Sequence, residues 1–234
     1  MRTIGLIGGM SWESTAIYYR LVNERVRARE GGLHSARVLL WSFDFDDVAA
    51  LQVKGDWHGA GQLLGEAARG LEKAGADLLL LCTNTMHKVA DAITGAVHLP
   101  FLHLADVTAA AVKAAGCRRP LLLATRYTME DDFYVGRLRD GHGIAAMVPD
   151  AAGRTIVHDV IFNELCRGIV KETSREALRR IISEAEGADS VILGCTELGM
   201  ILSQDDCSLP VFDTTRIHAD AAVDFAMSGR ERAP

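Results

Sequence analysis

Short, continuously apolar segments alternate with longer stretches of helical periodicity along the chain. The apolar segments lack the polar residue at every second position that a half-exposed strand would show, which is typical of parallel strands covered on both faces. The predicted strands are residues 4–7, 38–41, 78–81, 101–104, 121–124, 145–148, 191–193 and 211–212. The predicted helices are residues 15–29, 57–74, 105–115, 129–139, 159–165, 175–186 and 216–227. This alternation predicts a doubly wound α/β fold.

Parts of the sequence repeat at a similar spacing. The matched segments, with their offsets in parentheses, are residues 76–85 and 188–197 (112), 99–103 and 209–213 (110), and 3–9 and 119–125 (116). Chance matching of apolar runs is the plain alternative, but it does not account for similar offsets at three places. The repeat predicts two similar α/β domains with parallel central sheets, related by pseudo-two-fold symmetry.

The expected domain boundaries follow from this repeat. The N-terminal half comprises residues 1–98 plus 208–234, and the C-terminal half comprises residues 99–207. Ligands of open α/β sheets bind outside the carboxyl ends of the strands. Two halves that face each other would place their strand-end loops on one cleft, so we expect the active site in the cleft between the domains.

Composition and charge exclude several classes of protein. The 234 residues are 49% hydrophobic and 24% charged, which is ordinary for a soluble globular chain. A net charge of −6, without a cluster of Lys and Arg, argues against a nucleic-acid partner. No apolar stretch approaches the ~20 residues that span a bilayer, so no membrane association is expected. Five scattered cysteines do not suggest a secreted disulfide framework, and we expect a cytoplasmic protein with reduced thiols.

The segment Gly194-Cys195-Thr196-Glu197 is the first candidate for chemistry. It follows an apolar strand and precedes a predicted helical turn, where backbone N–H groups and the helix dipole would favour a Cys195 thiolate. The alternative is a small, inert core cysteine, which is the commonest state of this residue. Two polar residues directly after a strand end favour the functional interpretation.

A second polar loop follows the strand at residues 78–81. Thr83, Asn84 and Thr85 carry hydroxyl and amide groups that, with backbone N–H groups, can hold a carboxylate. Helix capping is the alternative, but it needs only one such residue. His87 is either a partner that supports a thiolate or a surface residue of the following helix.

The paired glycines before Met10 form a third candidate loop, because they allow a backbone to approach a ligand closely. The spacing is not that of a dinucleotide-binding loop. Ser11 or Ser14 could serve as a plain helix cap instead. The spacing of Cys82, His87 and Cys195 matches no usual zinc site, and no metal site is predicted.

Together these motifs resemble the aspartate/glutamate racemase family, and in particular its broad-specificity amino-acid racemase branch. The resemblance extends from Met1 to about Met227, and its most specific segments are residues 4–15, 82–88, 123–128 and 194–198. It implies an isomerase that works without pyridoxal phosphate or a metal. It also implies a small amino-acid substrate, a homodimer and two cysteines on opposite faces of the substrate α-carbon.

The resemblance also assigns roles to residues of this chain. Cys195 matches one of the two cysteines. Further positions match those that hold the substrate carboxylate and amino group, and they are Met10, Asn84, Thr85, Thr125 and Thr196. Gln52 is expected near the substrate side chain. Glu197 and His87 are expected to contact the catalytic groups rather than the substrate.

The sequence departs from the family at the second cysteine. The usual loop is Cys-Asn-Thr, and here Thr83 stands in the place of the cysteine. The internal repeat agrees, since it aligns Thr83 with Cys195. Cys82 is one residue too early, and it is expected to point into the core because successive strand residues face opposite sides. A Thr hydroxyl can donate a proton but is a poor base, so turnover is expected to favour one enantiomer as substrate.

A second departure concerns the substrate side chain. Aspartate racemases hold the distal carboxylate with an Arg and a Lys, and the matching positions here are Ala49 and Cys166. Gln52 and Arg167 lie nearby in sequence and could compensate. A buried carboxylate without a partner is costly, so we expect neutral or broad-range substrates rather than aspartate and glutamate alone.

Two other functions are compatible with these residues. A cleft with a single cysteine also resembles arylmalonate decarboxylases, in which one Cys protonates an enediolate after carbon dioxide leaves. An amino-acid-binding protein without catalysis is the second alternative. A purely structural protein would leave the polar loops unexplained.

Overall fold

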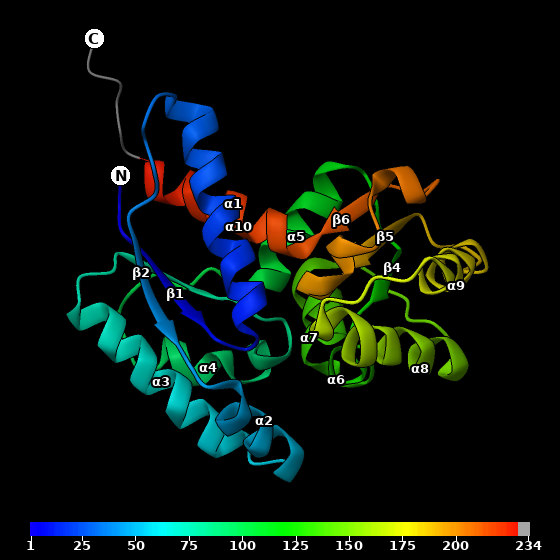
Figure 1. Ribbon diagram of the computed structural model, residues 1–234, viewed down its shortest axis with the longest axis horizontal. Coiled ribbons are helices and arrows are strands. Elements are labelled where there is room, and N and C mark those ends of the chain that lie inside the picture. Colours follow the sequence, from blue (N-terminus) through cyan, green and yellow to red (C-terminus); the bar gives the residue numbers. More distant parts are fainter. Residues whose placement is uncertain (229–234) are drawn as a thin grey trace. The chain divides into compact units, whose positions relative to one another are not determined.

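Two parallel sheets organise the chain, each within a unit of its own (Figure 1). The computed structural model describes residues 1–228, so residues 229–234 of the expected N-terminal half lie outside the described residues. One unit contains Met1–His103 together with the chain from His218 onward, and the other contains Leu104–Ile217. Residues 99–103 therefore belong with the first sheet and residues 208–217 with the second.

The first unit contains a sheet with the order β2-β1-β3, in which all strands are parallel. Its elements are β1 (Ile4–Gly8), α1 (Trp12–Glu30), β2 (Val38–Ser42), α2 (Phe45–Lys54), α3 (Trp57–Lys73), β3 (Leu78–Leu81), the 3₁₀ helix η1 (Thr85–Val89), α4 (Ala90–Thr94) and most of α10 (Thr214–Met227).

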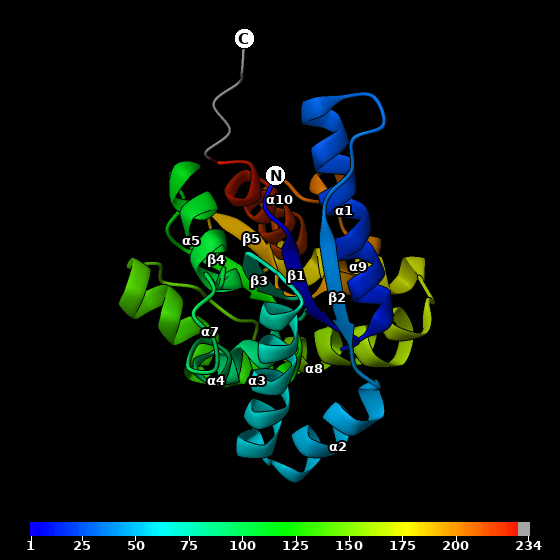
Figure 2. The same cartoon turned by 90° about the vertical axis from the view of Figure 1, so that its left-hand side faces the viewer.

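Helices cover both faces of this sheet, as the continuously apolar strands predict. Alternate residues of β1 enter different cores: Ile4 and Leu6 pack with α1 and α10, whereas Ile7 packs with α3 and α4. The two views of the ribbon show the same layering (Figures 1 and 2). Every residue of β1 and β3 is buried, so both strands end inside the unit and their following loops emerge at one edge.

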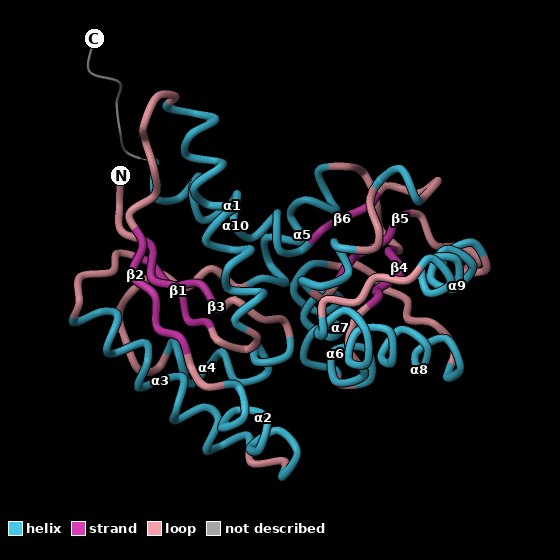
Figure 3. The backbone as a smooth tube through the Cα atoms, in the orientation of Figure 1, coloured by secondary structure: helices cyan, strands magenta, loops and turns pink. Residues whose placement is uncertain are grey.

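The second unit repeats this arrangement with the strand order β4-β5-β6 (Figure 3). Its elements are α5 (Leu104–Ala114), β4 (Pro120–Leu123), α6 (Arg126–Glu130), α7 (Asp132–Gly136), the π-helical segment η2 (Arg137–Gly141), α8 (Ala151–Asp159), the π-helical segment η3 (Val160–Glu164), the 3₁₀ helix η4 (Leu165–Arg167), α9 (Glu172–Ser183), β5 (Ser190–Leu193), the 3₁₀ helices η5 (Thr196–Met200) and η6 (Gln204–Asp206), and β6 (Val211–Asp213). Within residues 1–228, no helix is both long enough and apolar enough to cross a membrane.

The sequence repeat is visible in individual hydrogen bonds. Cys82 N donates to Ile7 O at 2.8 Å in the first unit, and Gly194 N donates to Leu123 O at 2.7 Å in the second. These atoms are related by the same offsets that relate the sequence segments. The same holds for the bonds Leu79 N to Pro100 O (2.9 Å) and Val191 N to Pro210 O (2.8 Å). The prediction of two similar α/β units with parallel sheets is confirmed.

Two of the eight predicted strands are not strands. Residues 101–104 contribute a single bridge between Leu79 and Phe101, and residues 145–148 contribute one between Leu121 and Met147. The first segment is cut short because α5 begins at Leu104. Each bridge lies at the edge where a fourth strand would add to its sheet.

The helix prediction differs from the structure in several places, and the short helix α4 is one that was not predicted. Helix α2 was not predicted, although Asp44 caps its start by accepting from Asp46 N at 3.1 Å. Helix α8 begins well before the predicted start at residue 159, where Asp150 accepts from Gly153 N at 2.7 Å. The predicted helix 129–139 is interrupted at Asp131, whose backbone is extended. At the starts of α2 and α8 a short Asp side chain caps the helix, and apolar periodicity does not show this boundary.

Candidate active site

The loop after β3 carries Thr83 at the point where the chain leaves the core. Cys82 is fully buried among apolar residues of the first unit, which confirms that it points inward. Burial raises the pKa of the Cys82 thiol far above its usual value. Thr83 is half-buried, and Asn84 and Thr85 are buried. The loop therefore offers hydroxyl and amide groups but no ionisable thiol.

His87 supports this loop from inside the protein. Its ring is buried, and Nδ1 lies 2.8 Å from the carbonyl oxygen of Thr83. A carbonyl oxygen can only accept, so Nδ1 carries the hydrogen. Burial, with the neighbouring His103 and His218, lowers the pKa of His87 well below its usual value. The interpretation of His87 as a surface residue is wrong, and its contact is with the backbone of Thr83.

The rings of two further histidines, His103 and His218, lie next to His87, and neither was predicted from the sequence to belong to the site. The rings of His87 and His103 are 4.6 Å apart, and those of His87 and His218 are 5.9 Å apart. His218 Nε2 donates to Leu102 O at 2.8 Å, so its Nδ1 accepts from the Tyr18 hydroxyl at 2.9 Å. Burial lowers the pKa of His218 to about 4. His87 and His218 are thus neutral near pH 7, and the loop rests on fixed hydrogen bonds.

The loop after β1 is shaped by Gly9. Its φ of 86° lies in the left-handed region, and a Cβ atom there would collide with the backbone of Phe43. Gly9 N donates to Thr15 Oγ1 at 2.8 Å, and Ser11 caps α1. The Met10 side chain is buried in the apolar core. Any contact between Met10 and a substrate would therefore be made by the backbone atoms of Met10.

Gln52 lies near the end of α2 and reaches η1. Its Nε2 is 3.0 Å from Met86 Sδ, so this side chain connects α2 to the segment that follows Thr83. Ala49, on the same helix, is half-buried. The structure thus brings Gln52 close to the Thr83 loop, but it places no cation at position 49.

In the second unit, Cys195 occupies the position equivalent to Thr83. Thr83 lies two positions after the end of β3 and shortly before η1. Cys195 lies two positions after the end of β5 and directly before η5. Gly194 precedes it, and a Cβ atom there would lie 2.7 Å from Leu122 Cδ1. The backbone of Cys195 is extended, with φ of −147° and ψ of 136°. Thr83 and Cys195, which the sequence repeat aligns, thus have the same place relative to their strands.

The side chain of Cys195 meets a carboxylate. Cys195 Sγ donates to Glu197 Oε2 at 2.8 Å, and Thr196 Oγ1 donates to the same oxygen at 3.0 Å. Glu197 is itself only 5% exposed. Burial, the charge of Glu197 and this hydrogen bond raise the pKa of Cys195 well above its usual value.

The backbone N–H of Glu197 lowers the pKa of Cys195, as predicted for the start of a helical turn, but burial and the Glu197 carboxylate outweigh this effect. The helix after Cys195 is a five-residue 3₁₀ segment, and the acceptor that it brings to the thiol is negatively charged. A neighbouring negative charge favours the neutral thiol. At rest, Cys195 is a protonated thiol whose hydrogen points to Glu197.

The other predicted residues of the second unit lie on different elements from Cys195 and Glu197, or next to them in sequence. Thr125 follows β4, and its Oγ1 lies 3.3 Å from Thr128 Oγ1. Cys166 belongs to η4, which packs against η5, and its thiol contributes to the raised pKa of Cys195. The neighbouring Arg167 is exposed. Thr125 and Thr196 thus lie at the carboxyl edge of the second sheet, as Asn84 and Thr85 do at the first.

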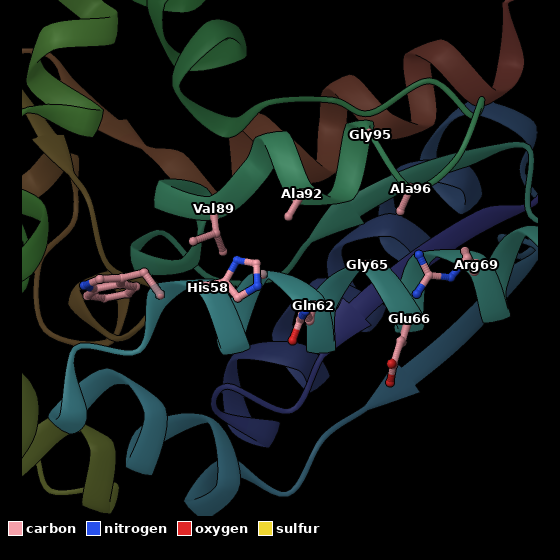
Figure 4. Close-up of a pocket in the computed structure, with 11 residues that line it drawn as sticks. His58, Gln62, Gly65, Glu66, Arg69, Val89, Ala92, Gly95 and Ala96 are labelled. Carbon is pink, nitrogen blue, oxygen red and sulfur yellow. The ribbon is translucent and has the colours of Figure 1, made fainter.

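A groove of about 710 Å³ lies elsewhere on the first unit, along α3 and α4. Figure 4 shows His58 and Arg69 on α3, on the side of the helix that faces Ala92 and Ala96. The groove includes none of the predicted site residues. Gly65 allows α3 to approach α4 closely here, because a Cβ atom at this position would lie 3.2 Å from the Ala92 carbonyl oxygen.

Comparisons with known proteins agree with this architecture. A family model described as Asp/Glu/Hydantoin racemase matches residues 7–222. The broad specificity amino-acid racemase RacX of Bacillus subtilis (strain 168) is 25% identical over 163 residues, which cover 68% of this chain and 68% of that protein. A Yersinia pestis protein solved as a candidate Asp/Glu racemase is 54% identical, with a TM-score of 0.92 over 97% of this chain and 99% of that one. An aspartate racemase homologue from Pyrococcus horikoshii OT3 is 35% identical, with a TM-score of 0.86 over 97% and 99% of the two chains.

Two like α/β units, each with polar residues at the carboxyl edge of a parallel sheet, together with the family match, define an α/β enzyme. The chain belongs to the Asp/Glu/Hydantoin racemase family, and it is an isomerase of the racemase class.

The contact between Cys195 and Glu197 predicts how this thiol titrates. Replacing Glu197 with Gln removes the negative charge and keeps an acceptor oxygen, so the pKa of Cys195 falls. Alkylation of Cys195 by iodoacetamide, followed by peptide mass spectrometry across pH, should show its midpoint at lower pH and several-fold faster reaction at pH 8. Glu186→Gln, at an exposed position of the same unit, is the matched control. An unchanged or higher midpoint in Glu197→Gln would contradict the assignment.

Proposed function

We propose that the chain racemises amino acids by cofactor-independent transfer of the α-proton, with Cys195 as the main acid–base group and Thr83 on the opposite face of the substrate. The observation that carries this proposal is the 2.8 Å bond from Cys195 to Glu197, at a position equivalent to that of Thr83. The similarity to a broad specificity amino-acid racemase supports the reaction class.

Glu197 supplies what Cys195 needs to act as a base. The thiol proton moves along the existing hydrogen bond to Glu197 Oε2, which leaves a thiolate beside a neutral carboxylic acid. The thiolate then takes the α-proton and becomes a thiol again, and the Thr83 hydroxyl delivers a proton to the other face of the carbanion. Water restores the proton on Thr83, and the hydroxide that this leaves takes the proton from Glu197, so that both groups return to their starting state. In the reverse direction Thr83 would have to act as a base, which its hydroxyl does poorly.

The carbanion needs stabilisation through the substrate carboxylate, because an α C–H is a far weaker acid than a thiol. Asn84 and Thr85 of the first unit, and Thr125 and Thr196 of the second, supply hydroxyl and amide donors at the strand ends. Their burial supports this role, because a donor in a poorly hydrated site acts more strongly on a developing charge.

The proposal predicts unequal exchange for the two enantiomers of a substrate. In deuterated water, without added pyridoxal phosphate or metal, α-hydrogen exchange should differ between the D and L forms by about tenfold or more. Cys195→Ala should lower the exchange rate of the enantiomer whose α-proton faces Cys195 by about 10³-fold, and it should stop the racemisation of both enantiomers. Cys207→Ala, at a half-buried thiol of the same unit, should leave them unchanged. Thr83→Cys should narrow the difference between the two rates.

Equal exchange rates in the unmodified enzyme would contradict the unequal roles of Cys195 and Thr83. Release of carbon dioxide without exchange would instead indicate the decarboxylase alternative, and binding without exchange would indicate an amino-acid-binding protein.

We also propose that the substrate side chain is neutral or variable. The positions that match the cations of aspartate racemases hold Ala49 and Cys166, and the nearby Arg167 is exposed. Gln52 offers an amide that reaches the Thr83 loop. A carboxylate side chain would be buried there without a cation, at a cost of several kcal/mol.

A panel of amino acids tests this specificity. Homoserine, methionine and leucine should be turned over at least as efficiently as aspartate and glutamate, by kcat/KM from circular dichroism of the remaining enantiomer. Cys166→Lys should raise the efficiency with aspartate by about tenfold, because it restores a cation. Aspartate far ahead of all neutral substrates in the unmodified enzyme would overturn the proposal.

His87 is proposed as a positioning residue for Thr83, since Nδ1–H holds the carbonyl of that residue. His87→Phe removes this donor, whereas His87→Asn keeps one near the same place. In His87→Phe, the loss of one hydrogen bond should reduce the exchange rate of the enantiomer that depends on Thr83 by about fivefold. In His87→Asn, this rate should stay close to that of the unmodified enzyme. If His87 had only a structural role, His87→Phe would lower the rates for both enantiomers together. The ratio of the two rates therefore distinguishes a positioning role from a structural one.

The proposed state of the enzyme is a homodimer in a reducing compartment such as the cytoplasm, acting on a small-molecule amino acid. All five cysteines are free thiols, which supports the choice of compartment.

A further inference from the structure

A second thiol lies beside Cys195 in the second unit. Cys166 is the middle residue of η4, and Cys195 directly precedes η5. These two segments pack together, with Cα atoms of η4 within 8 Å of Cα atoms of η5. Each is fixed by a leucine of the same core, Leu165 in η4 and Leu198 in η5. Both cysteines are half-buried at the surface of this core, on neighbouring segments.

The two thiols are close enough to influence each other. Cys166 is one of the groups that raise the pKa of Cys195, whereas none of the other cysteines contributes to it. Those cysteines are also placed differently in the fold. Cys82 is buried in the first unit, Cys117 is buried in the second, and Cys207 lies just after η6. Cys166 is therefore the thiol best placed to react with Cys195.

The backbone around Cys166 is suited to a small adjustment. A disulfide needs Cα atoms about 4.4–6.8 Å apart. The three residues of η4 lie between the π-helical segment η3 and Gly168, whose φ of 70° ends the helical run. Hydrogen bonds in 3₁₀ turns have poorer geometry than those in an α-helix. A shift of Cys166 toward η5 therefore disturbs less than it would within a regular helix.

We propose that Cys166 and Cys195 form a reversible disulfide after a hydroperoxide oxidises Cys195, so that Cys166 acts as the resolving thiol of this site. Cys195 is half-buried, so a molecule as small as hydrogen peroxide can reach its sulfur. The inference goes beyond the proposed reaction. It needs the contacts of the second unit and does not depend on racemisation.

The reaction has two steps. The Cys195 proton moves to Glu197 along the 2.8 Å hydrogen bond, and the thiolate attacks one peroxide oxygen. The O–O bond breaks as the S–O bond forms, and the hydroxide that leaves takes the proton from Glu197 to become water. The sulfur of Cys166 then attacks the Cys195 sulfenic acid. The S–S bond forms, and the hydroxyl group leaves as water with the proton of Cys166. Two thiols are thus oxidised by one peroxide, which is reduced to two water molecules.

The disulfide would stop the proposed reaction and protect the thiol at the same time. The bonded sulfur of Cys195 can no longer accept a proton. It is also shielded from further oxidation, because a sulfenic acid that finds no thiol is converted to a sulfinic acid, which ordinary thiol reductants do not reverse. A small dithiol would restore both cysteines by thiol–disulfide exchange.

Peptide mapping of the full chain tests the proposal. The protein is treated with hydrogen peroxide, blocked with N-ethylmaleimide and digested with trypsin without a reductant. Trypsin leaves Cys166 on the peptide 155–167, but it leaves Cys195 and Cys207 together on the peptide 181–216. The variant Cys207→Ser therefore assigns the link. It should give a cross-linked pair of these peptides that dithiothreitol separates. Absence of this pair, whether Cys195 stays reduced or becomes a sulfinic acid, would overturn the proposal.

The recovery of Cys195 in Cys166→Ser is the second measurement. Without the neighbouring thiol, the fraction of Cys195 that dithiothreitol returns to the thiol should fall about tenfold relative to Cys207→Ser. Equal recovery in the two variants would contradict the resolving role of Cys166. Cys207→Ser keeps Cys166 unchanged, so a folding defect in Cys166→Ser leaves the first measurement decisive. Both measurements record the oxidation state of sulfur, so they distinguish failure of this inference from failure of the proposed function.

Discussion

The parallel pairing of β1 with β3, and of β4 with β5, is the constraint on which both candidate loops depend. Each central pair is buried, and its register fixes where the chain must leave the core. The last ladder bond is donated by the residue directly after the strand, Cys82 in one unit and Gly194 in the other. The next residue is the first that can turn outward, and it is Thr83 or Cys195. The positions of the proposed catalytic groups are thus consequences of strand register.

Much of this could be predicted from the sequence because burial leaves a periodic signal. A strand covered on both faces must be apolar throughout, and the sequence repeat alone aligns Thr83 with Cys195. The segments at residues 101–104 and 145–148 are as apolar as true strands, yet each makes only one bridge. Their composition reflects burial, whereas strand length is decided by where the next helix begins, which apolar periodicity does not record.

The orientation of Glu197 could not be predicted for a related reason. The sequence places it two residues after Cys195, and in an extended chain the two side chains would share a side. In the 3₁₀ turn that forms instead, the carboxylate bonds both Cys195 and Thr196. A buried carboxylate is tolerated because these two donors compensate for lost hydration. The prediction of a thiolate rested on the backbone dipole alone. The full negative charge of Glu197, whose Oε2 is 2.8 Å from Cys195 Sγ, outweighs the partial charges of one short turn.

The two units have similar backbone arrangements, but different residues support the loops that carry Thr83 and Cys195. By the offset of 112 residues, Glu197 corresponds to Thr85, and His87 corresponds to Gly199. The loop of the first unit therefore rests on a neutral imidazole that holds a backbone carbonyl, and it has no carboxylate at the matching place. The loop of the second unit has a carboxylate that can receive a proton from its thiol. Even a thiol at position 83 would lack this acceptor, so the difference between the two faces lies in the surrounding residues as well as in the exchange of Cys for Thr. The Thr83→Cys variant should accordingly narrow the difference between enantiomers without making the two rates equal.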